Sequence, residues 1–166
     1  MDLAHPVAVA VDIEAGLLEH YPALARRLTL VLRDAAEAED TAQAAFARAL
    51  EQRHRFAGGD LRAWFYTIAL RLAFNELRRR RSRDGRTTDD RSPEREPTWA
   101  MSTDPDLWAA LAGLEPEHRA ALLLSTLEGY THAEIGAILG VRAGTVSSWL
   151  SRTKDRLRKI LGDDDR

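Results

Sequence analysis

Two clusters of basic residues are the side chains in this sequence best suited to bind a charged ligand. One comprises Arg78, Arg79, Arg80, Arg81 and Arg83, and the other Arg152, Lys154, Arg156, Arg158 and Lys159. Guanidinium and ammonium groups neutralise phosphates, so the clusters favour contact with nucleic acid. Each cluster alone also fits a plain solvated helix face, and that alternative stays open at this point.

The second cluster lies in a segment, residues 129–161, whose pattern is typical of a helix-turn-helix. Thr131 and Glu134 fit the capping box that starts a helix, and Gly140 is placed to end it with a left-handed cap. Small Gly136 lets the two helices approach closely. The second helix, which would enter a major groove, carries one apolar stripe: Val146, Leu150, Leu157 and Leu161.

The sequence lacks the patterns of common catalytic and metal sites. It contains no cysteine, and its five histidines are scattered: His5, His20, His54, His118 and His132. No metal-binding spacing or Ser-His-Asp arrangement is found, and Gly58-Gly59 lacks the strand and lysine of a nucleotide-binding loop. We therefore predict no enzyme activity, no metal and no cofactor.

Composition narrows the class of protein further. The 166 residues, 45% hydrophobic and 30% charged, suffice for one medium domain or two small helical ones. No signal peptide and no apolar run long enough to span a bilayer is apparent, so we expect a cytoplasmic protein without membrane insertion. The net charge of −2 combines the basic clusters with acidic stretches, which suits contact with DNA and with a second partner.

Helical periodicity dominates, and no alternating strand pattern is present. We predict helices over 12–33 (one helix, or a pair kinked at Pro22), 37–53 and 61–81, the last with Asp60 as its N-cap. The inward positions expected are Ala42, Phe46, Ala49 and Leu50, then Trp64, Ile68, Leu72 and Leu77.

Residues 82–105 interrupt this pattern with a polar segment that contains three prolines and is typical of a flexible linker. Helices over 107–114 and 116–127 precede the helix-turn-helix. The prediction is an all-α fold with two small helical domains, 1–82 and 106–162, joined by a linker over 83–105 and followed by an acidic tail, 163–166.

Over nearly its whole length the chain resembles an extracytoplasmic-function (ECF) sigma factor, a bacterial transcription initiation factor. The first domain resembles sigma region 2 through AEDTAQAAFARAL (38–50) and FAGGDLRAWFYTIALRLAFNELRRRR (56–81). The second resembles region 4 through residues 114–161. A helix-turn-helix alone is weak evidence, but both patterns in the family's order are strong. The resemblance implies a protein that binds core RNA polymerase and directs it to −10 and −35 promoter elements.

The resemblance also implies residue roles. The helix over 39–53 is expected to dock on the polymerase β′ coiled coil through Asp40, Gln43 and Arg48, with Phe46 in the core. Seven residues are expected to contact the −10 element: some in the loop would bind a flipped base, and others along the helix would contact the separated strand. They are Arg55, Phe56, Gly58, Asp60, Asn75, Arg78 and Arg79. Without the family match, the loop would be interpreted as a plain interhelical turn.

For the −35 element the resemblance implies eight residues: Arg119, Arg142, Gly144, Thr145, Ser147, Ser148, Trp149 and Arg152. Gly144 and Thr145 would approach the DNA backbone closely, and Arg152 would contact a phosphate or guanine. Trp108 and residues 122–124 would serve the core, with the polymerase β flap as a second candidate contact.

The sequence departs from the family pattern at several positions. Ala44 replaces a usual acid, Asn75 a commonly acidic residue, and Arg142 a frequent serine. Ser147 and Trp149 occupy places where basic residues are common, so we predict weak or unusual −35 recognition. Each lost phosphate contact lowers the salt dependence of binding by about one unit of slope.

Two alternatives remain open from the sequence. A stand-alone helix-turn-helix regulator would bind duplex DNA without polymerase, which the near-neutral charge disfavours. A sigma-like interaction module would bind polymerase without opening promoters. Many members of the family are held by an anti-sigma factor that wraps both domains, and the linker is long enough to permit such a partner.

Overall fold

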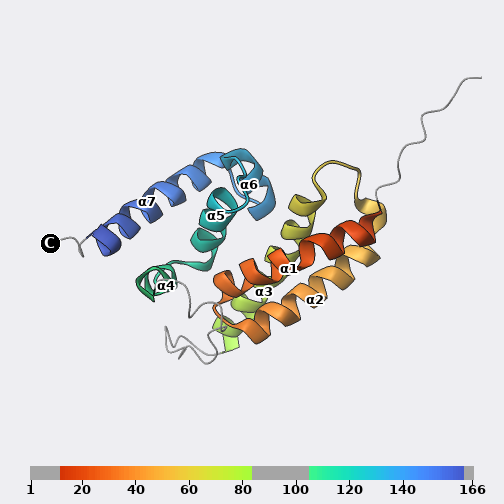
Figure 1. Cartoon of the computed structure of the whole chain (residues 1–166), viewed down its shortest axis with the longest axis horizontal. Coiled ribbons are helices and arrows are strands. Elements are labelled where there is room, and N and C mark those ends of the chain that lie inside the picture. The colour runs from red at the N-terminus through yellow and green to blue at the C-terminus, as the bar shows by residue number, and fades with distance from the viewer. Residues whose placement is uncertain (1–11, 84–104, 163–166) are drawn as a thin grey trace, which may run out of the picture.

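The computed structural model describes residues 12–83 and 105–162, and every long element in those ranges is an α-helix (Figure 1). The first half contains α1 (Ile13–Leu32), α2 (Ala35–Glu51), the short 3-10 turn η1 (Arg53–Arg55) and α3 (Leu61–Arg83). The second contains α4 (Pro105–Ala112), α5 (Pro116–Thr126), α6 (His132–Leu139) and α7 (Ala143–Gly162). The predicted all-α class is confirmed. Most of the predicted linker and the acidic tail fall outside the described residues.

Aspartates begin each of the three long helices in the first half. The carboxylates of Asp12, Asp34 and Asp60 accept hydrogen bonds from the backbone N–H groups three residues later, at 3.1, 2.9 and 3.0 Å. These bonds satisfy N–H groups that have no partner inside the helix. The N-cap predicted at Asp60 is therefore confirmed, and α1 is one helix with Pro22 inside it.

The first core forms where α1, α2 and α3 pack together. Ala42, Ala45 and Ala49 of α2 are fully buried, and these small side chains bring the helices close around Phe65. The inward face predicted for α3 is confirmed in part, because Trp64, Ile68, Leu72 and Leu77 are half-buried and pack against the core. The buried face is wider than predicted, since α3 is covered by α1 and α2 and also by α6; its buried positions are Leu61, Phe65, Tyr66, Ala69, Leu70, Ala73 and Phe74. On α2, Phe46 is half-buried and meets the ring of Tyr21 edge-on.

The second half contains the predicted helix-turn-helix, α6 and α7. Thr131 and Glu134 form the capping box, with bonds of 3.2 and 2.7 Å, and Gly140 ends α6 at φ 72°. A Cβ on Gly136 would lie 2.6 Å from the carbonyl oxygen of Val141, so glycine lets the turn fold against α6.

The stripe predicted along α7 is only partly buried. Val146, Leu150 and also Thr153 are enclosed, whereas Leu157 is half-buried and Leu161 is 40% exposed. The last turns of α7 extend beyond α5 and α6, which cover its first half (Figure 1). Leu161, at the end of the predicted stripe, therefore has no such cover. Trp108 and residues 122–124 are buried, which agrees with their expected core role.

The two halves pack directly on each other, α5 against α1 and α6 against α3. Leu28 and Val31 of α1 face Leu123 and Leu124 of α5 around a void of only about 10 Å³. One continuous hydrophobic cluster therefore runs through both halves. The sequence predicted two tethered domains and gave no sign of this contact.

Candidate polymerase and nucleic-acid interfaces

The outer face of α2 carries the three residues expected to contact polymerase. Asp40, Gln43 and Arg48 are all exposed, opposite the buried alanines. Gln43 Nε2 donates to Glu39 Oε1 at 3.2 Å, and the Tyr21 hydroxyl donates to the same oxygen at 2.7 Å. Burial, together with this bond to Glu39, raises the pKa of Tyr21 to about 12. The face is thus polar, solvated and ordered by its own bonds.

The loop before α3 has a conformation that depends on its two glycines. Gly58 and Gly59 have φ of 97° and 91°, and a Cβ would meet nothing within 4 Å at either position. Glycine is thus favoured there by the left-handed backbone and not by lack of space. Arg55 and Asp60 are exposed, while Phe56 is half-buried with its ring 5.4 Å from that of Trp64. The result is an open loop beside a fixed aromatic pair.

The first basic cluster divides into two kinds of residue. Arg78 and Arg79 are exposed, and Arg78 donates to the exposed Asn75 at 3.2 Å. Arg80 instead pairs with the buried carboxylate of Glu37 at 2.6 Å, which ties α3 to α2. Exposed Arg78 and Arg79 are therefore available to phosphates, whereas Arg80 belongs to the fold.

The start of α7 gathers most of the expected −35 residues on one surface. Arg142, Gly144, Ser147, Ser148 and Arg152 are exposed, and Thr145 is half-buried. Arg152 Nη2 donates to Ser148 Oγ at 2.8 Å, which holds the guanidinium along the helix.

Trp149 is half-buried, and its ring lies 5.0 Å from that of His118 on α5. The tryptophan therefore packs in part against α5.

Arg119 does not join this surface. Its side chain is buried, and Nη1 donates to the carbonyl oxygens of Leu111 and Ala112 at 3.3 and 3.4 Å. Burial and the nearby charge of Arg33 lower its pKa to about 10. The last carbonyls of α4 need a donor, and Arg119 supplies it. Its expected place on the DNA-facing surface is corrected by this observation.

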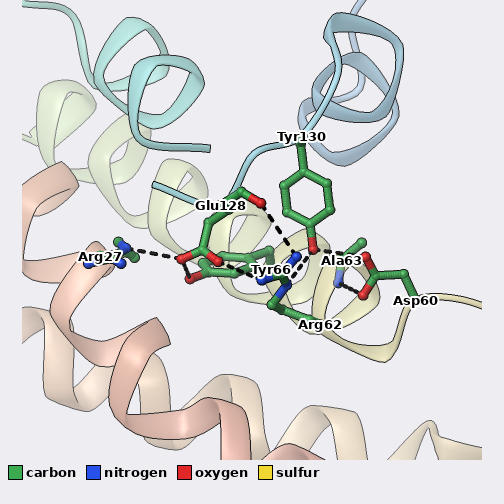
Figure 2. Close-up of polar contacts among 7 residues, drawn as sticks. All are labelled: Arg27, Asp60, Arg62, Ala63, Tyr66, Glu128 and Tyr130. Atoms are coloured by element: carbon green, nitrogen blue, oxygen red, sulfur yellow. Dashed lines mark hydrogen bonds and ion pairs between the residues drawn. The ribbon is translucent and has the colours of Figure 1, made fainter. Parts of the chain in front are cut away.

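A polar cluster between the halves was missed by sequence reasoning (Figure 2). Glu128 follows α5, and its carboxylate accepts bonds from Arg27 Nε at 3.0 Å, Arg62 Nη1 at 3.0 Å and the Tyr66 hydroxyl at 2.9 Å. The Glu128 side chain is only 6% exposed. Burial and the bond to Glu128 raise the pKa of Tyr66 well above its usual value. The partners are 62 to 101 residues from Glu128, so no local pattern could reveal them.

Tyr130 forms the other part of the cluster (Figure 2). Its hydroxyl donates to Asp60 Oδ2 at 3.0 Å and accepts from Arg62 Nε at 2.9 Å. The Arg62 guanidinium also lies 4.9 Å from the centre of the Tyr130 ring, within range of a cation–π contact. Desolvation acts to raise the pKa of Asp60, but bonds from Ala63 and Tyr130 and the Arg62 charge outweigh it, so that pKa is lowered.

Comparison with known proteins decides the family. The Sigma-70 region 2 family matches residues 17–83, and the Sigma-70 region 4 family matches residues 105–157. The chain is 34% identical over 151 residues to RNA polymerase sigma factor CarQ of Myxococcus xanthus, covering 87% of this chain and 86% of that protein. It is 34% identical over 169 residues to ECF RNA polymerase sigma factor SigL of Mycobacterium tuberculosis, covering 93% and 94%. The chain belongs to the ECF sigma factors.

A solved relative matches both halves of this ECF sigma factor in one superposition. The sigma factor RpoE of Bartonella quintana, crystallised with the anti-sigma factor NepR, is 29% identical, with a TM-score of 0.79 that covers 93% of this chain and 99% of that one. A score of this size over nearly the whole chain requires a similar placement of the two sigma domains.

The family fixes the role of the protein at a coarse level. An ECF sigma factor directs transcription initiation, and its partners are core RNA polymerase and promoter DNA. The relatives are sigma factors, which are not enzymes. Within residues 12–83 and 105–162, no helix is long and apolar enough to cross a membrane.

Proposed function

We propose that this sigma factor divides its work among three surfaces. The outer face of α2 binds the polymerase β′ coiled coil, the loop before α3 and the exposed end of α3 hold the −10 strand, and the start of α7 contacts the −35 duplex. One observation carries the proposal. The polar residues implied by the family are exposed on these elements, except that Thr145 is half-buried and Arg119 is buried.

The polymerase surface combines one acid, one amide and one cation on a single helix face. Asp40, Gln43 and Arg48 can pair with charges of both signs and fix the register of a partner helix by hydrogen bonds. Ala44, in the middle of this face, offers no acid where the family usually has one. We therefore expect docking on polymerase to depend more on Asp40 and Arg48 than in a typical member.

The −10 surface suits an unstacked strand. The left-handed loop leaves open space around Gly58, beside the fixed ring of Phe56, where an extruded base can lie and present its edge to the loop. Asn75 can bond to a base or sugar, and Arg78 and Arg79 can neutralise phosphates. Binding of the extruded base supplies the free energy that opens the duplex, so no nucleotide hydrolysis by the chain is needed.

The −35 surface offers one strong cationic contact near the N-terminus of a helix. Exposed Gly144 lets a phosphate approach the first N–H groups of α7, which carry a partial positive charge. Arg152 lies two turns further on and supplies the guanidinium. With serine and tryptophan at 147 and 149, we expect weak −35 binding that relies on polymerase to hold the domain on DNA.

Two finer statements belong to the same proposal. The chain carries out no reaction of its own, and it acts in the cytoplasm, where bacterial polymerase and DNA meet. We also propose an anti-sigma factor as a partner, because the similarly arranged RpoE of Bartonella quintana was crystallised with one.

The polymerase surface can be tested directly by titrating a labelled chain with purified bacterial core RNA polymerase. Arg48→Glu should weaken binding about tenfold or more, since reversal places like charges together at a complementary face. Arg158→Glu makes the same charge change on exposed α7, away from the three surfaces, and should leave binding nearly unchanged. Equal weakening by both variants, or by neither, would contradict the assignment of α2.

A further inference from the structure

The buried polar contact between the two halves is a candidate control element. We name as the interdomain latch the carboxylate of Glu128 and the hydroxyl of Tyr130 with their partners: Arg27, Asp60, Arg62 and Tyr66. We propose that this latch holds the free sigma factor in a closed arrangement that hinders promoter binding, and that polymerase and DNA bind the chain with the latch open. The inhibitory part of the proposal rests on the proposed function, whereas the existence of a closed state does not.

The latch is built as a set of charge-assisted hydrogen bonds around one buried acid. Glu128 receives bonds from two guanidinium groups and one hydroxyl while its side chain is 6% exposed. Such bonds are short and stronger than those between neutral groups. Because a buried carboxylate without partners is costly, the halves favour the position in which Arg27 and Arg62 reach it.

Glu128, the central residue of the latch, has no evident task in folding the second half. Among the residues that the structure describes, the hydrogen-bond partners of Glu128 lie on α1 and α3. Gly129, at φ 72°, turns the chain between Glu128 and Tyr130 so that both side chains point toward the N-terminal part of α3 (Figure 2). A contact that serves the interface alone can be lost without unfolding either half.

Closure affects the groups that the proposed function gives to the −10 strand. Asp60, at the end of the loop before α3, already accepts a hydrogen bond from the Tyr130 hydroxyl. Further along α3, Asn75 and Arg78 line a groove of about 350 Å³ whose opposite wall is formed by Leu139 and Gly140 of α6. A strand that follows α3 would have to enter this groove, so the second half stands in its path.

The latch is also able to open. The side chains of Arg27 and Arg62 are 24% and 36% exposed, so water reaches them and separation does not strand fully buried cations. The small cavity of about 10 Å³ beside the latch leaves part of the apolar contact unfilled, which removes some of its packing energy. Binding of the two halves to separate promoter elements and to polymerase can therefore compensate for the broken bonds.

A two-label distance measurement tests whether the closed state is populated. The chain has no cysteine, so Ala36→Cys on α2 and Lys154→Cys on α7 give two specific fluorophore sites, both exposed. High transfer efficiency is expected for the free chain, and Glu128→Ala should shift the closed-to-open ratio toward open by about 10- to 30-fold, as expected for loss of charge-assisted bonds. Glu128→Gln, which keeps the size of the side chain, should give a smaller shift in the same direction.

A matched control separates the latch from general charge effects. Glu115 pairs with Arg81 across the same two halves at 3.4 Å, but both side chains are more than 60% exposed. Glu115→Ala should leave the transfer efficiency nearly unchanged, since exposed ion pairs contribute little. Circular dichroism of each variant checks that its helices persist.

The inhibitory role is tested by titrating the same labelled chains with purified bacterial core RNA polymerase. Binding should separate the two labels and lower the transfer efficiency. The Glu128→Ala chain should bind polymerase several-fold more tightly, because a closed population no longer reduces its apparent affinity. Low transfer in the unmodified free chain overturns the closed state, and high transfer that does not shift with Glu128→Ala overturns the role of the latch in holding it. A clear shift without tighter polymerase binding overturns the inhibitory role alone. Failure of the unmodified chain to bind polymerase would instead refute the proposed function.

Discussion

Gly136→Ala should destabilise the helix-turn-helix even though alanine is the better helix former. Gly136 is buried within α6, where replacing glycine by alanine ordinarily stabilises a helix by about 1 kcal/mol. Here an added Cβ would lie 2.6 Å from the carbonyl oxygen of Val141 and 3.3 Å from the backbone N of Ala143. Both atoms belong to the turn, and Val141 itself donates to the Gly136 carbonyl at 2.9 Å. The obstacle is therefore backbone, which cannot rotate away.

The magnitude follows from setting these two effects against each other. Overpacking costs about 1–3 kcal/mol, and a backbone obstacle places this site toward the upper end. After the helix-propensity gain, the net loss should be about 1–2 kcal/mol, which lowers the melting temperature of a chain of this size by about 3–6 °C.

Gly144→Ala supplies the matched control for stability. Gly144 lies in the first turn of α7, and a Cβ there would meet nothing within 4 Å. That variant should gain a few tenths of a kcal/mol to about 1 kcal/mol. Thermal unfolding of the full chain followed by circular dichroism measures both variants. A Gly136→Ala chain as stable as the unmodified protein would refute the close approach of turn and helix.

Three further outcomes are expected. Arg80→Ala should lower the free energy of unfolding by about 2–3 kcal/mol in urea denaturation, because it removes the cation paired with buried Glu37. Arg79→Ala, at an exposed position, should change that free energy by less than about 0.5 kcal/mol. Arg152→Ala should weaken duplex DNA binding and reduce the slope of log affinity against log salt by about one, as measured by fluorescence anisotropy over a salt series. The pKa of Asp60 is lowered in the folded chain, so its contribution to stability is complete above about pH 4 and is lost as pH falls through the folded value. Stability should hence fall in acid and less steeply for Asp60→Asn, with pH-dependent thermal unfolding as the measurement.

Local features of this fold could be predicted from the sequence because short-range chemistry determines them. The capping box at Thr131, the left-handed cap at Gly140 and the N-cap at Asp60 each depend on residues within three or four positions. The presence of the long helices could likewise be predicted from the helical spacing of apolar residues. The exposed candidates on α2 and at the start of α7 came from the family resemblance, whereas periodicity indicated only the inner positions of these helices.

Features that depend on how distant helices meet could not be predicted. The predicted stripe on α3 was incomplete because that helix is covered on two sides, which widens the buried face toward Phe65 and Tyr66. The family resemblance placed Arg119 on the DNA-facing surface. Its bonds to the end of α4 could not be foreseen, because they depend on the packing of two helices. Glu128 resembles an ordinary acid at a helix end, and its role emerges only with Arg27 and Arg62 beside it.

Run-off transcription tests the central claim most directly. Purified bacterial core RNA polymerase would be incubated with fragments of the genome that encodes this chain, with and without the protein. We predict transcripts from discrete start sites that require the chain and that are lost with Arg48→Glu but retained with Arg26→Glu, the same charge change on the exposed side of α1. Failure of the chain to bind core polymerase, or the absence of any start site that depends on it, would contradict the account.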